Sequence, residues 1–136
     1  MKKDDLLTVQ TGEVGLTTIV PKYLEGSNCH ALIISRFKRK KVDPWFYAHY
    51  FNSPTGRLRL RDLEVGTTMK HINVADLLAW KVPYPENKEE QSEIATVLSD
   101  IDTEITALET RRTKTQAIKQ GMMQELLTGR TRLVNS

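Results

Sequence analysis

The chain contains 136 residues, which is enough for one small domain and one appendage. Hydrophobic residues make up 39% of it and charged residues 27%, as in an ordinary folded protein, and the formal net charge is +3. No apolar run approaches the roughly 20 residues of a membrane span, and Met1–Asp5 lacks the apolar segment of a signal peptide, so we expect no membrane association.

The charges are segregated along the chain. Residues 1–84 carry 13 Lys and Arg against 8 Asp and Glu, whereas residues 85–136 carry 7 against 9. Within 36–61 the single acid is Asp43, and the cations are Arg36, Lys38, Arg39, Lys40, Lys41, Arg57, Arg59 and Arg61. Such a cluster indicates a surface for a polyanion, with nucleic acid the first candidate. Composition alone is equally compatible with a solvated charged face.

The first 35 residues predict three short strands separated by turns. The segments Leu6–Gln10, Leu16–Val20 and Ala31–Ser35 are rich in apolar and β-branched residues. Between them, Thr11–Gly15 and Glu25–Asn28 contain glycines that permit tight turns.

The middle of the chain predicts a helix, a loop and a last strand. Asp43-Pro44 is typical of a helix start, with Asp as N-cap and Pro at the first helical position, so we expect a helix over Trp45–Asn52. Residues 53–68 are loop-like with a basic stretch, Val74–Leu78 suggests a short helical turn, and Ala79–Val82 a strand. The pattern is therefore mixed α+β with a small core.

The last third of the chain predicts one long amphipathic helix over residues 88–127. Asn87 can cap its start, and Gly129 provides a stop signal. The expected helix-pairing interface comprises Ile94, Leu98, Ile101, Ile105, Leu108, Ile118, Met122 and Leu126. The first five recur at alternating steps of four and three, as in a heptad seam, and a polar stretch over 109–116 interrupts it.

The length of this helix implies a partner. At 1.5 Å per residue it would span roughly 60 Å, more than the small domain could cover. Part of the apolar stripe must therefore meet a second helix, from another chain or from a segment outside this sequence. The alternative is a helix folded back on its own domain.

Candidate DNA contacts fall in three places. The first is the cation cluster over 36–41, because phosphate contacts require long cations. In the second, Arg57, Arg59 and Arg61 alternate, which in an extended segment would place all three on one face. Their alternative role is surface pairing with nearby acids. The third is a loop with short hydroxyls and cationic or polar tips, formed by Thr67, Thr68, Lys70 and His71.

Catalytic readings find little support in this sequence. Asp43–Phe46 is similar to the Asp/Asn-Pro-Pro-aromatic motif of amino-methyltransferases, but Trp45 replaces the second proline, and a helix start explains the motif better. The histidines show no metal-ligand spacing, and no phosphate-binding loop occurs. Cys29 is the single cysteine, and we interpret it as a packed thiol of a protein in a reducing cytoplasm. We therefore expect no catalytic residues, metal or cofactor.

The aromatic residues at helical spacing allow two interpretations. Trp45, Tyr47 and Tyr50 could stack on bases, but aromatics spaced in this way are more often core residues.

Several short motifs together resemble one known family. They are Lys81–Pro85 followed by Glu90–Ala95, Ile101–Ile105, Lys119–Gly129, Asp4–Leu7 with Thr11–Gly15, and Gly66–Thr68 with Ile72. Each motif is weak alone. In this order and spacing, across nearly the whole chain, they resemble type I restriction–modification specificity (S) subunits.

The resemblance implies a fold and a function. A family member usually holds two target-recognition domains, each followed by a spacer helix. The two helices pair as an antiparallel coiled coil and hold two modification (methyltransferase) subunits, and each domain reads half of a split DNA site. For this chain it implies a partial recognition domain over 1–86, a spacer and dimerisation helix over 87–129 and a tail over 130–136. The recognition domain then looks amino-terminally truncated.

Two functional hypotheses follow. In the first, the chain is a non-catalytic DNA-specificity component that binds double-stranded DNA, pairs as a homodimer through its helix, and joins modification and restriction subunits. In the second, it is a truncated fragment that acts only as a protein–protein interaction module and does not read DNA.

Overall fold

The computed structural model describes residues 1–38 and 41–134, and its contacts divide the chain into two compact units, Met1–Val97 and Leu98–Ser136. The first unit contains an antiparallel sheet of β1 (Leu6–Val9), β2 (Thr17–Ile19) and β3 (Leu32–Ser35), in the order β2-β1-β3. These strands confirm the three predicted from the sequence. A short 3-10 turn, η1 (Lys22–Leu24), follows β2.

The outer edge of β2 is closed by a side chain rather than by another strand. The Asn52 amide accepts a hydrogen bond from the Thr17 backbone N–H at 3.0 Å and donates one to the Thr17 carbonyl at 2.7 Å. These are the two bonds that a neighbouring strand would make. The contact satisfies the edge and attaches the end of helix α1 (Pro44–Asn52) to the sheet.

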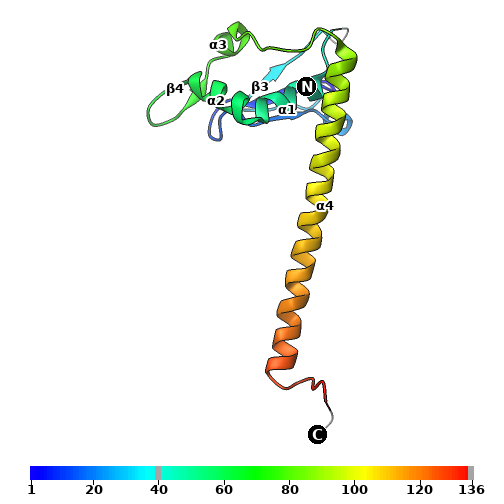
Figure 1. Cartoon of the computed structure of the whole chain (residues 1–136). Coiled ribbons are helices and arrows are strands. Elements are labelled where there is room, and N and C mark those ends of the chain that lie inside the picture. Colours follow the sequence, from blue (N-terminus) through cyan, green and yellow to red (C-terminus); the bar gives the residue numbers. More distant parts are fainter. Residues whose placement is uncertain (39–40, 135–136) are drawn as a thin grey trace. The chain divides into compact units, whose positions relative to one another are not determined.

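Helix α1 begins where the sequence predicts, because the Asp43 side chain accepts from the Trp45 backbone N–H at 2.8 Å and Pro44 occupies the first helical position. Helix α1 lies against the sheet (Figure 1), and side chains from both form an apolar core. The buried members of this core are Leu6, Val14, Ile19, Ile33, Tyr47, Ala48, Phe51, Leu60, Ile72 and Leu77.

A second helix, α2 (Pro54–Asp62), occupies much of the segment 53–68 that the sequence predicts as a loop, so that prediction is wrong. Ser53 starts the helix: its hydroxyl accepts from the Gly56 backbone N–H at 3.1 Å and donates to the Tyr50 carbonyl at 2.6 Å. A Cβ at Gly56 would lie 2.0 Å from the Tyr50 carbonyl oxygen, so the tight junction between the two helices requires glycine.

A small hairpin and a short helix complete the domain. Strands β4 (Glu64–Val65) and β5 (His71–Ile72) pair antiparallel, and α3 (Val74–Ala79) follows. The short helix confirms the predicted helical turn. The predicted strand over Ala79–Val82 is wrong: Trp80 ends α3, and its ring stacks on Phe51 with centroids 5.0 Å apart. That ring packing, rather than strand pairing, holds the segment.

The long helix is confirmed as α4 (Lys88–Leu127), 40 residues without a break (Figure 1). Asn87 caps it by accepting from the Glu89 backbone N–H at 2.8 Å, and Gly129 follows its end with a φ of 73°. Among the helices of the described residues, none is long and apolar enough to cross a membrane.

The first turns of α4 are fixed to the domain by a buried amide. Gln91 is fully buried. Its side-chain oxygen accepts from the Asp43 backbone N–H at 2.9 Å, and its nitrogen donates to the Lys41 and Pro85 carbonyls at 3.2 and 2.8 Å. The adjacent Ser92 hydroxyl donates to the Asp43 carboxylate at 2.7 Å. One side chain thus joins three segments of the backbone.

We predict that Gln91→Glu destabilises the domain by about 2–4 kcal/mol, because a carboxylate cannot donate to the two carbonyls and would bury a charge beside them. Urea unfolding followed by tryptophan fluorescence measures this change, since Trp45 and Trp80 lie in the domain. The matched control is Glu90→Gln at the exposed neighbouring position. A Gln91→Glu variant within about 0.5 kcal/mol of the wild type would contradict the prediction.

Candidate nucleic-acid interface

Arg36, the first cation of the predicted phosphate-binding cluster, is held by an ion pair. Its guanidinium binds Asp5 through two hydrogen bonds, Nε to Oδ1 at 2.8 Å and Nη2 to Oδ2 at 2.6 Å. Asp5 is 1% exposed and also accepts from the Lys2 backbone N–H at 2.7 Å. The Arg36 hydrogen bonds lower the pKa of Asp5, against the opposing effect of burial. Arg36 therefore has a structural role besides the predicted DNA contact.

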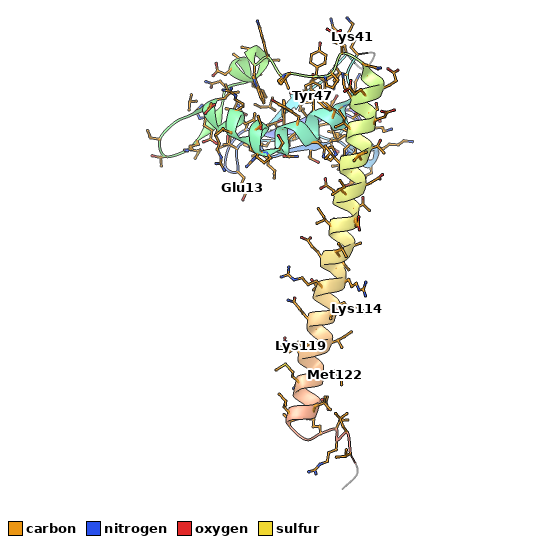
Figure 2. All side chains as sticks on the ribbon, in the orientation of Figure 1. Glu13, Lys41, Tyr47, Lys114, Lys119 and Met122 are labelled. Atoms are coloured by element: carbon orange, nitrogen blue, oxygen red, sulfur yellow. The ribbon has the colours of Figure 1, made fainter. Side chains whose placement is uncertain are left out.

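Two further cations of that cluster, Lys38 and Lys41, are described by the structure. Lys38 and Lys41 are exposed, and the Lys41 backbone N–H donates to the Lys38 carbonyl at 3.0 Å. The predicted DNA-binding residues Arg39 and Lys40 lie outside the described residues. Figure 2 shows Lys41 beside the start of α4, where its carbonyl accepts from Gln91.

The arginines of α2 do not share one face, contrary to the prediction from an extended backbone. In a helix, residues four apart lie together and residues two apart lie on nearly opposite sides. Arg57 and Arg61 accordingly line one hollow. Arg59 instead pairs with Asp62 at 3.6 Å and lines another hollow with Trp80. The alternative of surface pairing thus holds for Arg59.

The hollow beside Arg57 and Arg61 is open and has a volume of about 620 Å³. Its walls come from the turn after β1, from α2 and from the β4–β5 hairpin. They are formed by Gly12, Glu13, Val14, Arg57, Arg61, Glu64 and Lys70. This arrangement gathers three cations and two carboxylates, which suits a ligand with both acceptor and donor groups.

The predicted loop over 67–71 is the tip of the β4–β5 hairpin. Thr67, Thr68 and Lys70 are exposed, and Lys70 pairs with Glu64 at 3.1 Å. His71 is half-buried on β5, and its Nδ1 lies 3.5 Å from the Met69 carbonyl. The hydroxyls are therefore available to a ligand, whereas His71 is partly enclosed.

The aromatic residues of α1 divide between core and surface. Tyr47 is 5% exposed and stacks on Phe37 with ring centroids 4.7 Å apart, and burial raises its pKa to about 12. Figure 2 shows it inside the domain. Tyr50 packs against Trp80, whereas Trp45 is 51% exposed. Tyr47 and Tyr50 therefore pack in or against the core, as one of the two interpretations predicts.

The second surface of interest is the apolar stripe of α4. Six of the eight predicted pairing residues are between 40% and 56% exposed: Leu98, Ile101, Ile105, Leu108, Ile118 and Met122. Ile94 and Leu126 are half-buried. These residues form an exposed apolar row along one side of α4.

Sequence reasoning missed three side chains of this region. Asp5 carries no sequence signal for pairing with a residue 31 positions away, and Gln91 none for its backbone partners. Glu13 lies in a segment that the sequence marks only as a glycine-containing turn. Helix α2 did carry a sequence signal for its start. Ser53-Pro54 repeats the pattern of Asp43-Pro44, in which a polar N-cap residue precedes a proline.

Comparison with known proteins identifies the relatives of this chain. Residues 1–120 match the model of the type I restriction modification DNA specificity domain. The chain is similar to the type I restriction enzyme MjaVIII specificity subunit of Methanocaldococcus jannaschii, with 32% identity over 99 residues, which are 73% of this chain and 23% of that protein. Its fold is similar to the crystal structure of a type I restriction–modification S subunit from M. genitalium, with a TM-score of 0.71 and 20% identity, covering 92% of this chain and 33% of that one. The chain thus spans about a quarter to a third of these relatives.

The Asp5–Arg36 pair predicts a specific dependence of stability on pH. Because the pKa of Asp5 is lower in the folded state, the pair stabilises the fold above the unfolded value of about 4, and this contribution is lost as the pH falls through the lower, folded value. Asp5→Asn should therefore cost about 1–3 kcal/mol at pH 7, and its difference from the wild type should shrink below about pH 4.

Urea unfolding at pH 7, 5 and 3 measures this difference. The control is Asp62→Asn, which removes an exposed pair and should cost about 0–1 kcal/mol. An Asp5→Asn deficit that stays constant down to pH 3 would show that the carboxylate charge contributes nothing.

Proposed function

This chain belongs to the family of type I restriction–modification DNA specificity domains, and we propose that it is a DNA target-recognition component of such a system. In this proposal residues 1–86 bind double-stranded DNA and residues 87–129 pair with a second helix. The modification and restriction subunits of the complex supply the catalysis. The single observation that carries the proposal is the family match over residues 1–120, which includes both the basic domain and most of α4.

The charges of the first unit support a DNA-binding role. Lys38 and Lys41 are exposed, and Arg57 and Arg61 line one hollow beside the β4–β5 hairpin. Exposed cations bind phosphates without regard to sequence, whereas side chains in a hollow can meet base edges. We assign phosphate contacts to the lysines, and base contacts to the hollow with Thr67 and Thr68.

The exposed stripe of α4 supports a pairing role. We propose that two copies pair through this stripe as an antiparallel coiled coil, which would place the polar stretch over 109–116 opposite itself. Such a symmetric pair presents two identical domains and would favour an interrupted, inverted-repeat target. The same helix pair is the proposed site for modification subunits.

A second function uses the helix alone. The stripe of α4 is exposed and lies outside the proposed DNA contacts, so it supports a role as a protein–protein interaction module that binds modification or full-length specificity subunits. DNA binding distinguishes the two functions.

We predict that the chain binds duplex DNA with an affinity that falls steeply with salt. A plot of log K against log salt concentration has a negative slope, and each phosphate contact adds about 0.9 to its magnitude. Replacing both Lys38 and Lys41 by Ala should therefore reduce the magnitude of the slope by roughly 2. Fluorescence anisotropy with a labelled duplex, at salt concentrations from about 50 to about 200 mM, measures the slope.

The matched control replaces two lysines of α4, Lys114→Ala with Lys119→Ala, both labelled in Figure 2. It should leave the slope unchanged. Undetectable binding of the wild type at low salt, even with a modification subunit present, would favour the interaction module instead.

We also predict that Ile101→Asp, or Ile105→Asp, converts a dimer into monomers, because it places a charge in the apolar seam. Sedimentation velocity measures the change, with Thr103→Asp as a control on the opposite side of α4. If the wild type sediments as a monomer at micromolar concentration, pairing between copies is excluded at that concentration.

A further inference from the structure

The hollow beside α2 is a built site, because its three walls are attached to one another. The Arg57 guanidinium donates to the Val14 carbonyl at 3.2 Å and so joins α2 to the turn after β1. A Cβ at Gly15 would lie 3.0 Å from the Leu60 Cβ, so glycine lets this turn approach the helix closely. The hairpin is joined to the same turn, since the Ile72 backbone N–H donates to the Gln10 carbonyl at 3.1 Å.

The charged groups of the hollow divide into those that are engaged and those that are not. Arg57 is held by Val14, and Lys70 pairs with Glu64 at 3.1 Å. Within residues 1–38 and 41–134, the side chains of Arg61 and Glu13 have no ion pair or hydrogen bond. Both are exposed at the rim, and Figure 2 shows Glu13 projecting from the domain surface. The site therefore presents one free guanidinium and one free carboxylate.

A guanidinium and a carboxylate at one hollow are complementary to one kind of base pair. In the major groove, guanine presents two adjacent acceptors, N7 and O6, which match the donor fork of arginine. Its partner cytosine presents the N4 amino donor, which a carboxylate accepts. We propose that Arg61 and Glu13 together read a G·C pair, with Arg61 on guanine and Glu13 on cytosine. This inference rests on the proposed function and names the substrate feature that the hollow recognises.

The carboxylates argue against a phosphate in this hollow. A phosphodiester would gain from Arg57 and Arg61 but would be repelled by Glu13, which makes no ion pair with a described residue. Lys38 and Lys41 are exposed cations that lie outside this hollow, and the described structure shows no ion pair between either of them and a carboxylate. Phosphate contacts therefore belong to the lysines and base reading to the hollow.

An A·T pair matches the hollow less well. Adenine places one acceptor beside its amino donor, an arrangement that the amide of Asn or Gln matches, and thymine adds a methyl group that needs an apolar contact. The hollow has one apolar side chain, the buried Val14, and no amide side chain among its described lining residues.

The test is selection of binding sites from a random duplex library by the full chain, with sequencing of the retained DNA. The wild type should select a motif that contains a fixed G·C pair. Arg61→Lys keeps the charge but loses the planar fork, so preference for guanine at that pair should fall roughly 5- to 150-fold while total binding persists. Glu13→Gln should weaken the preference for cytosine at the same base pair. Lys81→Ala, which removes an exposed cation outside the hollow, is the control and should select the wild-type motif.

The outcomes separate the inference from the proposed function. If Arg61→Lys and Glu13→Gln relax the same G·C pair and leave the other positions unchanged, the inference is supported. If both variants select the wild-type motif, or relax different pairs, the inference is overturned while the proposed function stands. If the wild type retains no preferred sequence, the proposed target recognition fails and the inference fails with it.

Discussion

The buried amide of Gln91 is the contact that holds the start of α4 within the first unit. A side-chain amide has one acceptor and one donor group, and here both are used on backbone groups of separate segments, at Lys41, Asp43 and Pro85. Neither a carboxylate nor an apolar side chain of the same size could make these bonds. Because Asp43 also caps α1 and accepts from Ser92, the starts of α1 and α4 share one hydrogen-bonded network.

The helical state of residues 54–62 decides which cations can act together. As a strand, this stretch would present Arg57, Arg59 and Arg61 on a single face. As a helix, it places Arg57 and Arg61 in one hollow and turns Arg59 towards Asp62 and Trp80. The helix also buries Leu60 in the core, which anchors the hollow to the sheet. The chemistry of the proposed interface therefore follows from the capping of α2 by Ser53 rather than from the number of arginines.

Not every cation of this domain is available to bind a polyanion. Arg36 belongs to the basic cluster by sequence, but its guanidinium is bound to a buried carboxylate, and Lys70 is bound to Glu64. Lys38, Lys41 and Arg61 are exposed cations for which the described structure shows no ion pair. A surface that binds a polyanion depends on the cations that remain available, because a paired cation must give up its partner before it can meet a phosphate.

The sequence by itself determined the elements whose signals are local: the three strands, the capped start of α1, and the 40 residues of α4 with their apolar stripe. It also supported membership in the family, through motifs spread over most of the chain. It did not predict α2, although Ser53-Pro54 is a start signal, because alternating Arg and Leu fits a strand as well as a helix. The tertiary structure alone decided that Asp5 meets Arg36, that Gln91 joins three segments, and that Glu13 shares a hollow with Arg61. Asp5 and Arg36 lie 31 positions apart, and Gln91 and Lys41 lie 50 apart. Hydrogen-bond partners at such separations are set by how the sheet and helices pack, not by any local pattern.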